Sequence, residues 1–143
     1  MPIEWLLEEH TVQRNQLRLQ LHLNVAACAL KMPIVKPYPN LCTPKKEVDA
    51  HKDAIRHCTR VLDTDKHSVK ALYRRALAHL MIPPERHING LADALNDLKR
   101  ALELDPENAD VKRELKRARA LQKEIDKKES GMFTKMIGNG ELV

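Results

Sequence analysis

The segment at residues 53–66 recurs forty positions later, at residues 93–106. Five of the fourteen aligned positions are identical. The identical pairs are Asp53/Asp93, Ala54/Ala94, Arg60/Arg100, Leu62/Leu102 and Asp65/Asp105. The segments that precede these two also match, at an offset of 50, with Ala26 over Ala76 and Leu30 over Leu80. A recurrence at this spacing predicts a linear array of similar units, each of which packs on its neighbours.

We expect the units to be helical. Aromatic residues make up 3% of the 143 residues, there are only 4 Gly, and Ala and Leu dominate the apolar set. Residues 17–23 alternate as a strand would, but the run is long, Ala-rich and free of Gly, which favours a helix at 14–31. Four prolines exclude a helix over about 33–45. Further helices are predicted at 45–63, 67–81, 88–104 and from 107 to 128 or beyond, with the end of another at 4–11.

This pattern is similar to the tetratricopeptide repeat, a pair of antiparallel helices about 34 residues long. The offsets of 40 and 50 exceed that length by about 6 and 16 residues, and both excesses fall in turns between the two helices of a repeat. We therefore predict an all-α solenoid formed by a single tetratricopeptide-repeat domain at 1–143. Its parts are a remnant of a first repeat at 1–13, a second repeat at 14–66 with a Pro-rich insertion at 33–46, a third repeat at 67–106, and a C-terminal capping helix at 107–137.

Three segments resemble the tetratricopeptide domains of the large immunophilins: the forty-kilodalton cyclophilins, the larger FK506-binding proteins and their aryl-hydrocarbon-receptor-interacting relatives. They are residues 23–31, residues 70–76 and the tail at 127–136. The resemblance implies a co-chaperone docking module. In that family a separate isomerase domain carries the catalysis. No such sequence is present here, so we expect this chain not to be an enzyme.

Lys70 and Arg74 stand four residues apart on one face of the predicted third-repeat helix, where two cations repel. They would serve as solvated surface charges or as a site for a carboxylate. The resemblance implies the second role. Asn24, Lys70 and Arg74 match three residues of a carboxylate clamp that binds the Glu-Glu-Val-Asp tail of a ninety- or seventy-kilodalton heat-shock chaperone. Tyr73 and Arg75 are candidates for supporting the groove.

The clamp of the family contains two further groups, a Lys and an Asn from the first helix of the first repeat. The corresponding positions would lie before Met1, so the chain holds three of the five groups. The alternative function is therefore a scaffold, in which the groove binds an internal helix or loop of another partner and the clamp residues are idle.

Calmodulin is a further possible partner, at residues 111–128. Val111, Leu115, Ala118, Leu121 and Ile125 form one stripe there, and the window 112–128 has eight basic and three acidic residues. The net charge of this window, +5, equals that of the whole chain, so positive and negative charges balance in the rest of the sequence. The simpler interpretation is that this stripe caps the last repeat. No aromatic residues interleave the basic ones, which argues against nucleic acid.

The remaining features predict no catalytic centre, metal site or cofactor. His51, His57, His67, His79 and His87 are scattered, and no Cys/His spacing matches a zinc site. Cys42 lies in the Pro-rich loop without a neighbouring base for nucleophilic catalysis. No apolar run approaches the length of a membrane span. Three cysteines without a close pair favour a reducing compartment, so we expect a cytoplasmic or nuclear location.

Overall fold

The computed structural model describes residues 3–31, 47–83 and 86–138, and this part of the chain consists of helices and short connections without a strand. The predicted all-α class is therefore confirmed. Neighbouring helices pack as antiparallel pairs, as in a tetratricopeptide solenoid. In chain order the helices are α1 (Ile3–Lys31), α2 (Glu47–Thr64), α3 (Val69–Met81), α4 (Gly90–Leu104) and α5 (Ala109–Gly138).

The predicted helix bounds were wrong at the N-terminal end of the chain. The segments expected at 4–11 and 14–31 form one continuous helix, α1. Neither Gly nor Pro lies between them, so nothing interrupts the backbone hydrogen bonds. Helix α5 runs through Gly131 and ends at Gly138. A single Gly costs a helix only about 1 kcal/mol, which the long α5 tolerates. The Pro-rich insertion at 33–46 and Cys42 lie outside the described residues.

Two corners of the structure share one hydrogen-bond pattern, forty residues apart. The backbone N–H of Ser68 donates to the Asp65 carbonyl at 3.3 Å, and that of Asn108 donates to the Asp105 carbonyl, also at 3.3 Å. The side-chain oxygens of Ser68 and Asn108 each accept from the backbone N–H three residues later, at 3.4 and 3.2 Å. Each residue thus caps the helix that follows it. The sequence recurrence is therefore a recurrence of local structure.

Small side chains bring the helices close together. The main core joins α2, α3, α4 and α5 around Leu72, Leu98 and Val111, all fully buried. A second cluster joins α1, α2 and α3. Its buried members are Ala26, Ala29, Ala54, Cys58 and Ala78. Alanine at these positions lets neighbouring backbones approach, so the solenoid is held by many short-range contacts between successive helices.

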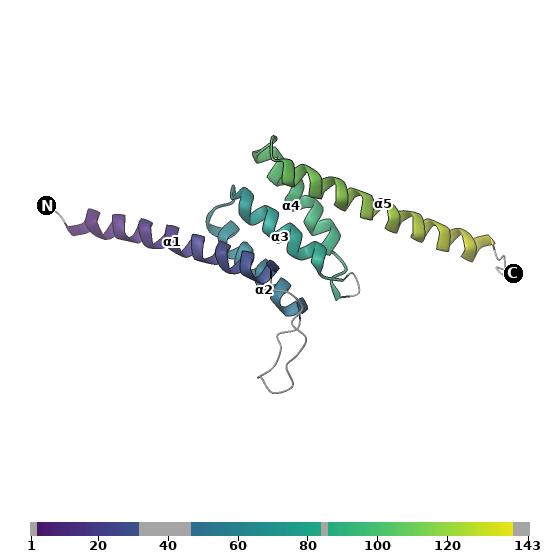
Figure 1. The fold of residues 1–143 in the computed structure, drawn as a ribbon, viewed down its shortest axis with the longest axis horizontal. Coiled ribbons are helices and arrows are strands. Elements are labelled where there is room, and N and C mark those ends of the chain that lie inside the picture. Colours follow the sequence, from purple (N-terminus) through teal and green to yellow (C-terminus); the bar gives the residue numbers. More distant parts are fainter. Residues whose placement is uncertain (1–2, 32–46, 84–85, 139–143) are drawn as a thin grey trace, which may run out of the picture.

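Helices α1 and α5 extend past the central helices on opposite sides (Figure 1). Apolar side chains of both helices are exposed, among them Leu17 and Leu21 of α1 and Met132 and Phe133 of α5. In the part of the chain that the structure describes, no helix combines the length and apolar character that crossing a bilayer requires.

Candidate functional site

The candidate clamp lies where α1 meets α3. Arg74 reaches from α3 to α1, and its Nη1 donates a hydrogen bond of 2.6 Å to the main-chain carbonyl of Leu23. Asn24, the next residue of α1, is exposed, as is Lys70, one turn before Arg74 on α3. The structure therefore places the guanidinium of Arg74 beside the backbone that carries Asn24. Neither Lys70 nor Arg74 is in an ion pair with a described residue.

Tyr73 lies on the side of α3 that faces α5. It is partly buried and packs against the main core. Its pKa is raised above the ordinary value, first by burial and then by the carboxylates of Glu114 and Asp110. Both carboxylates belong to the start of α5. Tyr73 therefore lies near the acidic start of α5, and its role in supporting the groove stays a prediction.

Arg75 has a different environment from the one expected of groove support. Its Nε and Nη2 lie 2.7 Å from the two carboxylate oxygens of Asp97 on α4. Its Nη1 also donates to the hydroxyl of Thr59 on α2 at 3.3 Å. The hydrogen bond with Asp97 raises the pKa of Arg75 above its ordinary value, against the effect of burial. Arg75 thus links α2, α3 and α4, and we leave it out of the proposed groove.

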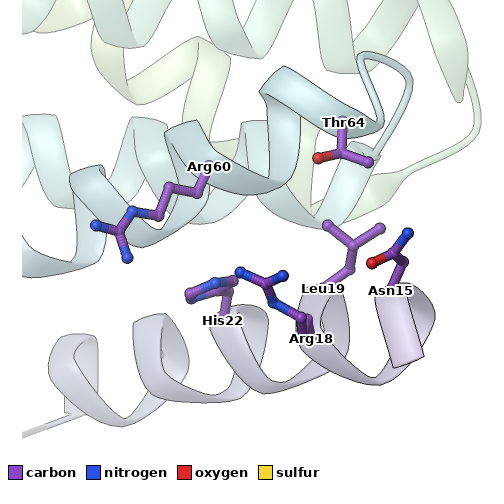
Figure 2. Close-up of a pocket in the computed structure, with 6 residues that line it drawn as sticks. All are labelled: Asn15, Arg18, Leu19, His22, Arg60 and Thr64. Carbon is purple, nitrogen blue, oxygen red and sulfur yellow. The ribbon is translucent and has the colours of Figure 1, made fainter. Parts of the chain in front are cut away.

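A cavity of about 450 Å³ opens elsewhere, between α1 and α2 (Figure 2). Its lining includes two cations, Arg18 from α1 and Arg60 from α2, together with His22. The other lining residues are Asn15, Leu19 and Thr64. None of the three candidate clamp residues takes part. The sequence analysis missed this cavity, because its two cations lie 42 positions apart and only helix packing brings them together.

The apolar stripe predicted on α5 divides into two parts. Val111, Leu115 and Ala118 are buried against the preceding helices, whereas Leu121 is exposed and Ile125 is half-buried. The first part therefore packs into the main core, together with residues of α2, α3 and α4. A second hollow, of about 410 Å³, runs along the same helix. It is lined by Leu102, Lys112, Leu115, Lys116, Arg119, Ala120 and Lys123.

Comparison with known proteins finds relatives among the large FK506-binding proteins. The chain is 31% identical over 137 residues to FK506-binding protein 59 of Drosophila melanogaster, which covers 93% of this chain and 29% of that protein. It is 31% identical over 108 residues to the peptidyl-prolyl cis-trans isomerase FKBP4 of Bos taurus, which covers 76% of this chain and 19% of that protein. The similarity thus includes most of the present sequence.

The relatives extend beyond this group. Outer envelope protein 61 of Arabidopsis thaliana is 35% identical over 86 residues, which cover 58% of this chain and 14% of that protein. The chain spans between about an eighth and three tenths of the length of the curated relatives that it matches. No protein-family model and no solved structure matches it.

Proposed function

Since this chain belongs with the tetratricopeptide-repeat regions of the large immunophilins, we propose that it is a protein-docking module of the co-chaperone type. Its ligand is the free C-terminal Glu-Glu-Val-Asp tail of a ninety- or seventy-kilodalton heat-shock chaperone. The observation that carries the proposal is the hydrogen bond of 2.6 Å from Arg74 to the Leu23 carbonyl, which brings the cationic face of α3 to the segment of Asn24.

The three side chains offer complementary donors to such a tail. A C-terminal Asp presents two carboxylates, one from its side chain and one from the chain terminus. Lys70 supplies a compact charge with three donors, Arg74 a planar fork with five, and Asn24 a neutral amide. The bond to Leu23 occupies one donor of Arg74 and fixes the direction of its guanidinium. The remaining donors are available for a carboxylate, with little side-chain entropy left to lose.

The contribution of each cationic clamp residue to binding follows from the strength of its hydrogen bonds. A hydrogen bond to a charged group contributes roughly 1.5–3 kcal/mol, and a tenfold change in Kd corresponds to about 1.4 kcal/mol. Loss of Lys70 or Arg74 therefore weakens binding by about 10- to 150-fold.

Titration with a peptide that ends in Glu-Glu-Val-Asp tests the proposal. We expect saturable binding to the unaltered chain, loss of most affinity in Lys70→Ala and Arg74→Ala, and loss with a peptide whose C-terminus is amidated. Lys99→Ala is the matched control, because Lys99 is an exposed cation on α4, away from the α1–α3 contact. Equal affinities for the free and amidated peptides would refute the clamp and favour a scaffold that binds an internal segment.

FKBP4 is named a peptidyl-prolyl cis-trans isomerase, but the matched region makes up only 19% of the bovine protein. We propose that this chain has no isomerase activity of its own. A proline-isomerisation assay on a chromogenic peptide, with a complete FK506-binding protein as positive control, should give the uncatalysed rate. Acceleration that scales with the concentration of this chain would contradict the proposal.

For the alternative partner, calmodulin, the burial of Val111, Leu115 and Ala118 is the main obstacle. Calmodulin would have to remove the first half of α5 from the core in order to reach these side chains. We therefore propose capping as the role of residues 111–118 and retain the chaperone tail as the preferred ligand. A cytoplasmic or nuclear location is consistent with this partner.

A further inference from the structure

Two histidines and an aspartate converge where α3 turns into α4. His79 is in the last turn of α3, His87 is in the connection, and Asp93 is in the first turn of α4. Nδ1 of His79 lies 2.8 Å from Nε2 of His87, and the same Nε2 lies 3.7 Å from Oδ2 of Asp93. One potential ligand atom from each residue lies within 4.8 Å of the other two. Among the described residues, no other group of three has this property.

The two imidazoles meet edge to edge. Their ring centroids are 4.9 Å apart, far longer than the nitrogen–nitrogen distance of 2.8 Å, and the ring planes differ by 19°. The facing nitrogens therefore point toward each other in nearly one plane. In neutral histidines one of them donates its N–H and the other accepts. A metal ion would replace that hydrogen once the donor ring carries its proton on the other nitrogen.

The backbone leaves room for this arrangement at Gly90. A Cβ placed on Gly90 would lie 2.6 Å from Cδ2 of the His87 ring and 3.2 Å from the main-chain oxygen of His79. Any side chain at position 90 would therefore displace the His87 ring. Gly90 thus permits the close contact between the start of α4 and the His87 imidazole. A substitution at position 90 would therefore disturb the site while all three candidate ligands remain.

The three candidate ligands differ in their exposure. His79 is 7% exposed and lies deepest. His87 and Asp93 lie at the surface, with side chains 30% and 48% exposed. The buried ring thus forms the base of the site, and the two outer ligands leave it open to ions from solution.

We propose that His79, His87 and Asp93 bind a divalent transition-metal ion, with Zn²⁺ as the best fit. Imidazole nitrogen and carboxylate oxygen are common zinc ligands, at about 2.0–2.2 Å. Two such ligands on a tetrahedral ion are separated by about 3.3 Å. The imidazoles would therefore separate slightly from 2.8 Å, and Asp93 would approach from 3.7 Å. Three protein ligands leave the fourth position to water.

Bound metal would connect the end of α3 to the start of α4 across residues 82–89. The sequence analysis expected no metal site, and the spacing explains why. His79, His87 and Asp93 are separated by 8 and 6 positions, and they belong to α3, to the connection and to α4. Neither separation corresponds to the three- or four-residue step that places two ligands on one helix face.

Co²⁺ titration of the full chain, followed by competition with Zn²⁺, tests the site. We expect one ion per chain, with visible absorption typical of four-coordinate cobalt and without the ultraviolet band of a cobalt–thiolate bond. His87→Ala and Asp93→Asn should each weaken Zn²⁺ binding at least tenfold. Both positions are at the surface, and circular dichroism will verify that these variants fold. Gly90→Ala should weaken binding although every ligand remains.

The second histidine pair provides the matched control. Nδ1 of His22 and Nδ1 of His57 also lie 2.8 Å apart, but this pair belongs to no three-ligand group among the described residues. His22→Ala should leave the affinity for Zn²⁺ unchanged. The proposal is overturned if His87→Ala binds as tightly as the unaltered chain, if His22→Ala abolishes binding, or if the unaltered chain binds no Zn²⁺ at 100 micromolar free metal.

Discussion

Arg75 and Asp97 form a two-pronged ion pair between α3 and α4, with both nitrogen–oxygen distances at 2.7 Å. Asp97 is only 4% exposed. The parallel geometry, together with the hydrogen bond from Arg75 to Thr59, satisfies both partners where water has little access. Such a pair costs much more to break than to replace, because removal of one charge leaves the other buried alone.

Asp97→Ala should therefore destabilise the fold by about 3–5 kcal/mol, the range for a broken buried ion pair. Urea unfolding followed by circular dichroism will measure the change. The matched control is Asp110→Ala, which breaks the exposed Asp110–Arg113 pair on α5. A surface pair contributes about 0–1 kcal/mol, so this variant should unfold close to the unaltered chain. Similar losses of unfolding free energy in the two variants would show that the buried Arg75–Asp97 pair stabilises the fold no more than an exposed ion pair does.

The capping role of α5 makes a second prediction. Leu115 is 3% exposed and packs into the main core, whereas Met136 on the same helix is 77% exposed. Leu115→Ala should cost about 2–5 kcal/mol of unfolding free energy, as is typical of a large-to-small change in a core. Met136→Ala should change it by less than about 0.5 kcal/mol. Thermal unfolding of both variants will test the difference, and equal stability would exclude the packing described for α5.

Cysteine reactivity gives a third prediction. Burial raises the pKa of the Cys58 thiol to about 11, whereas Cys28 is exposed. Thiolate is the reactive form, so iodoacetamide at pH 8 should modify Cys28 in the folded chain and spare Cys58 until the chain unfolds. Mass spectrometry of tryptic peptides will locate the label. Rapid modification of Cys58 under native conditions would contradict the packing between α1 and α2.

The same shift determines the direction of a pH effect. The folded state holds the Cys58 proton more tightly than the unfolded state, so this thiol contributes stability below its unfolded pKa of about 8.5. That contribution is lost as pH rises from about 9 toward 11. Between pH 8 and 11, the unfolding free energy of Cys58→Ala should therefore fall by less than that of the unaltered chain. At pH 8 the variant is the less stable of the two.

The proposed clamp makes a fourth prediction, concerning geometry rather than charge. Arg74→Lys keeps the positive charge but removes the planar fork and the reach to the Leu23 carbonyl. We expect it to weaken binding of the Glu-Glu-Val-Asp peptide about tenfold, which corresponds to about 1.4 kcal/mol. Isothermal titration calorimetry will measure this effect.

Salt provides the complementary measurement. Affinity of the unaltered chain should fall as NaCl rises from 50 to 500 millimolar, because exposed charges are screened. Lys70→Ala should show a shallower dependence, since one of the charges is gone. If Arg74→Lys bound the peptide as well as the unaltered chain, simple charge attraction would explain the binding and the fork would have no role.

The sequence predicted the helices well where local signals determine them. Pro marks connections, Ala-rich runs mark helices, and the repetition at forty positions marks equivalent corners such as Ser68 and Asn108. The break expected between residues 11 and 14 was wrong. The apolar pattern changes there, but no residue that breaks helices lies at the change, so α1 continues through it.

Contacts across long sequence separations were harder to predict. Arg75 and Asp97 are 22 positions apart, and either could have been a surface charge until α3 and α4 packed together. Arg74 and Leu23 are separated by 51 positions, and only a resemblance to a known family indicated that their segments meet. The clamp assignment of Asn24, Lys70 and Arg74 stays a prediction, which the peptide titration will decide.

The two equivalent corners have a consequence for how chains of this kind change in length. Each corner is fixed by a few hydrogen bonds within residues 65–68 or 105–108, so its geometry is independent of the turns on either side. Insertions in those turns alter the spacing between corners and leave the angle at each corner intact. Evolution can therefore lengthen a loop for a new purpose without reorienting the helices that follow.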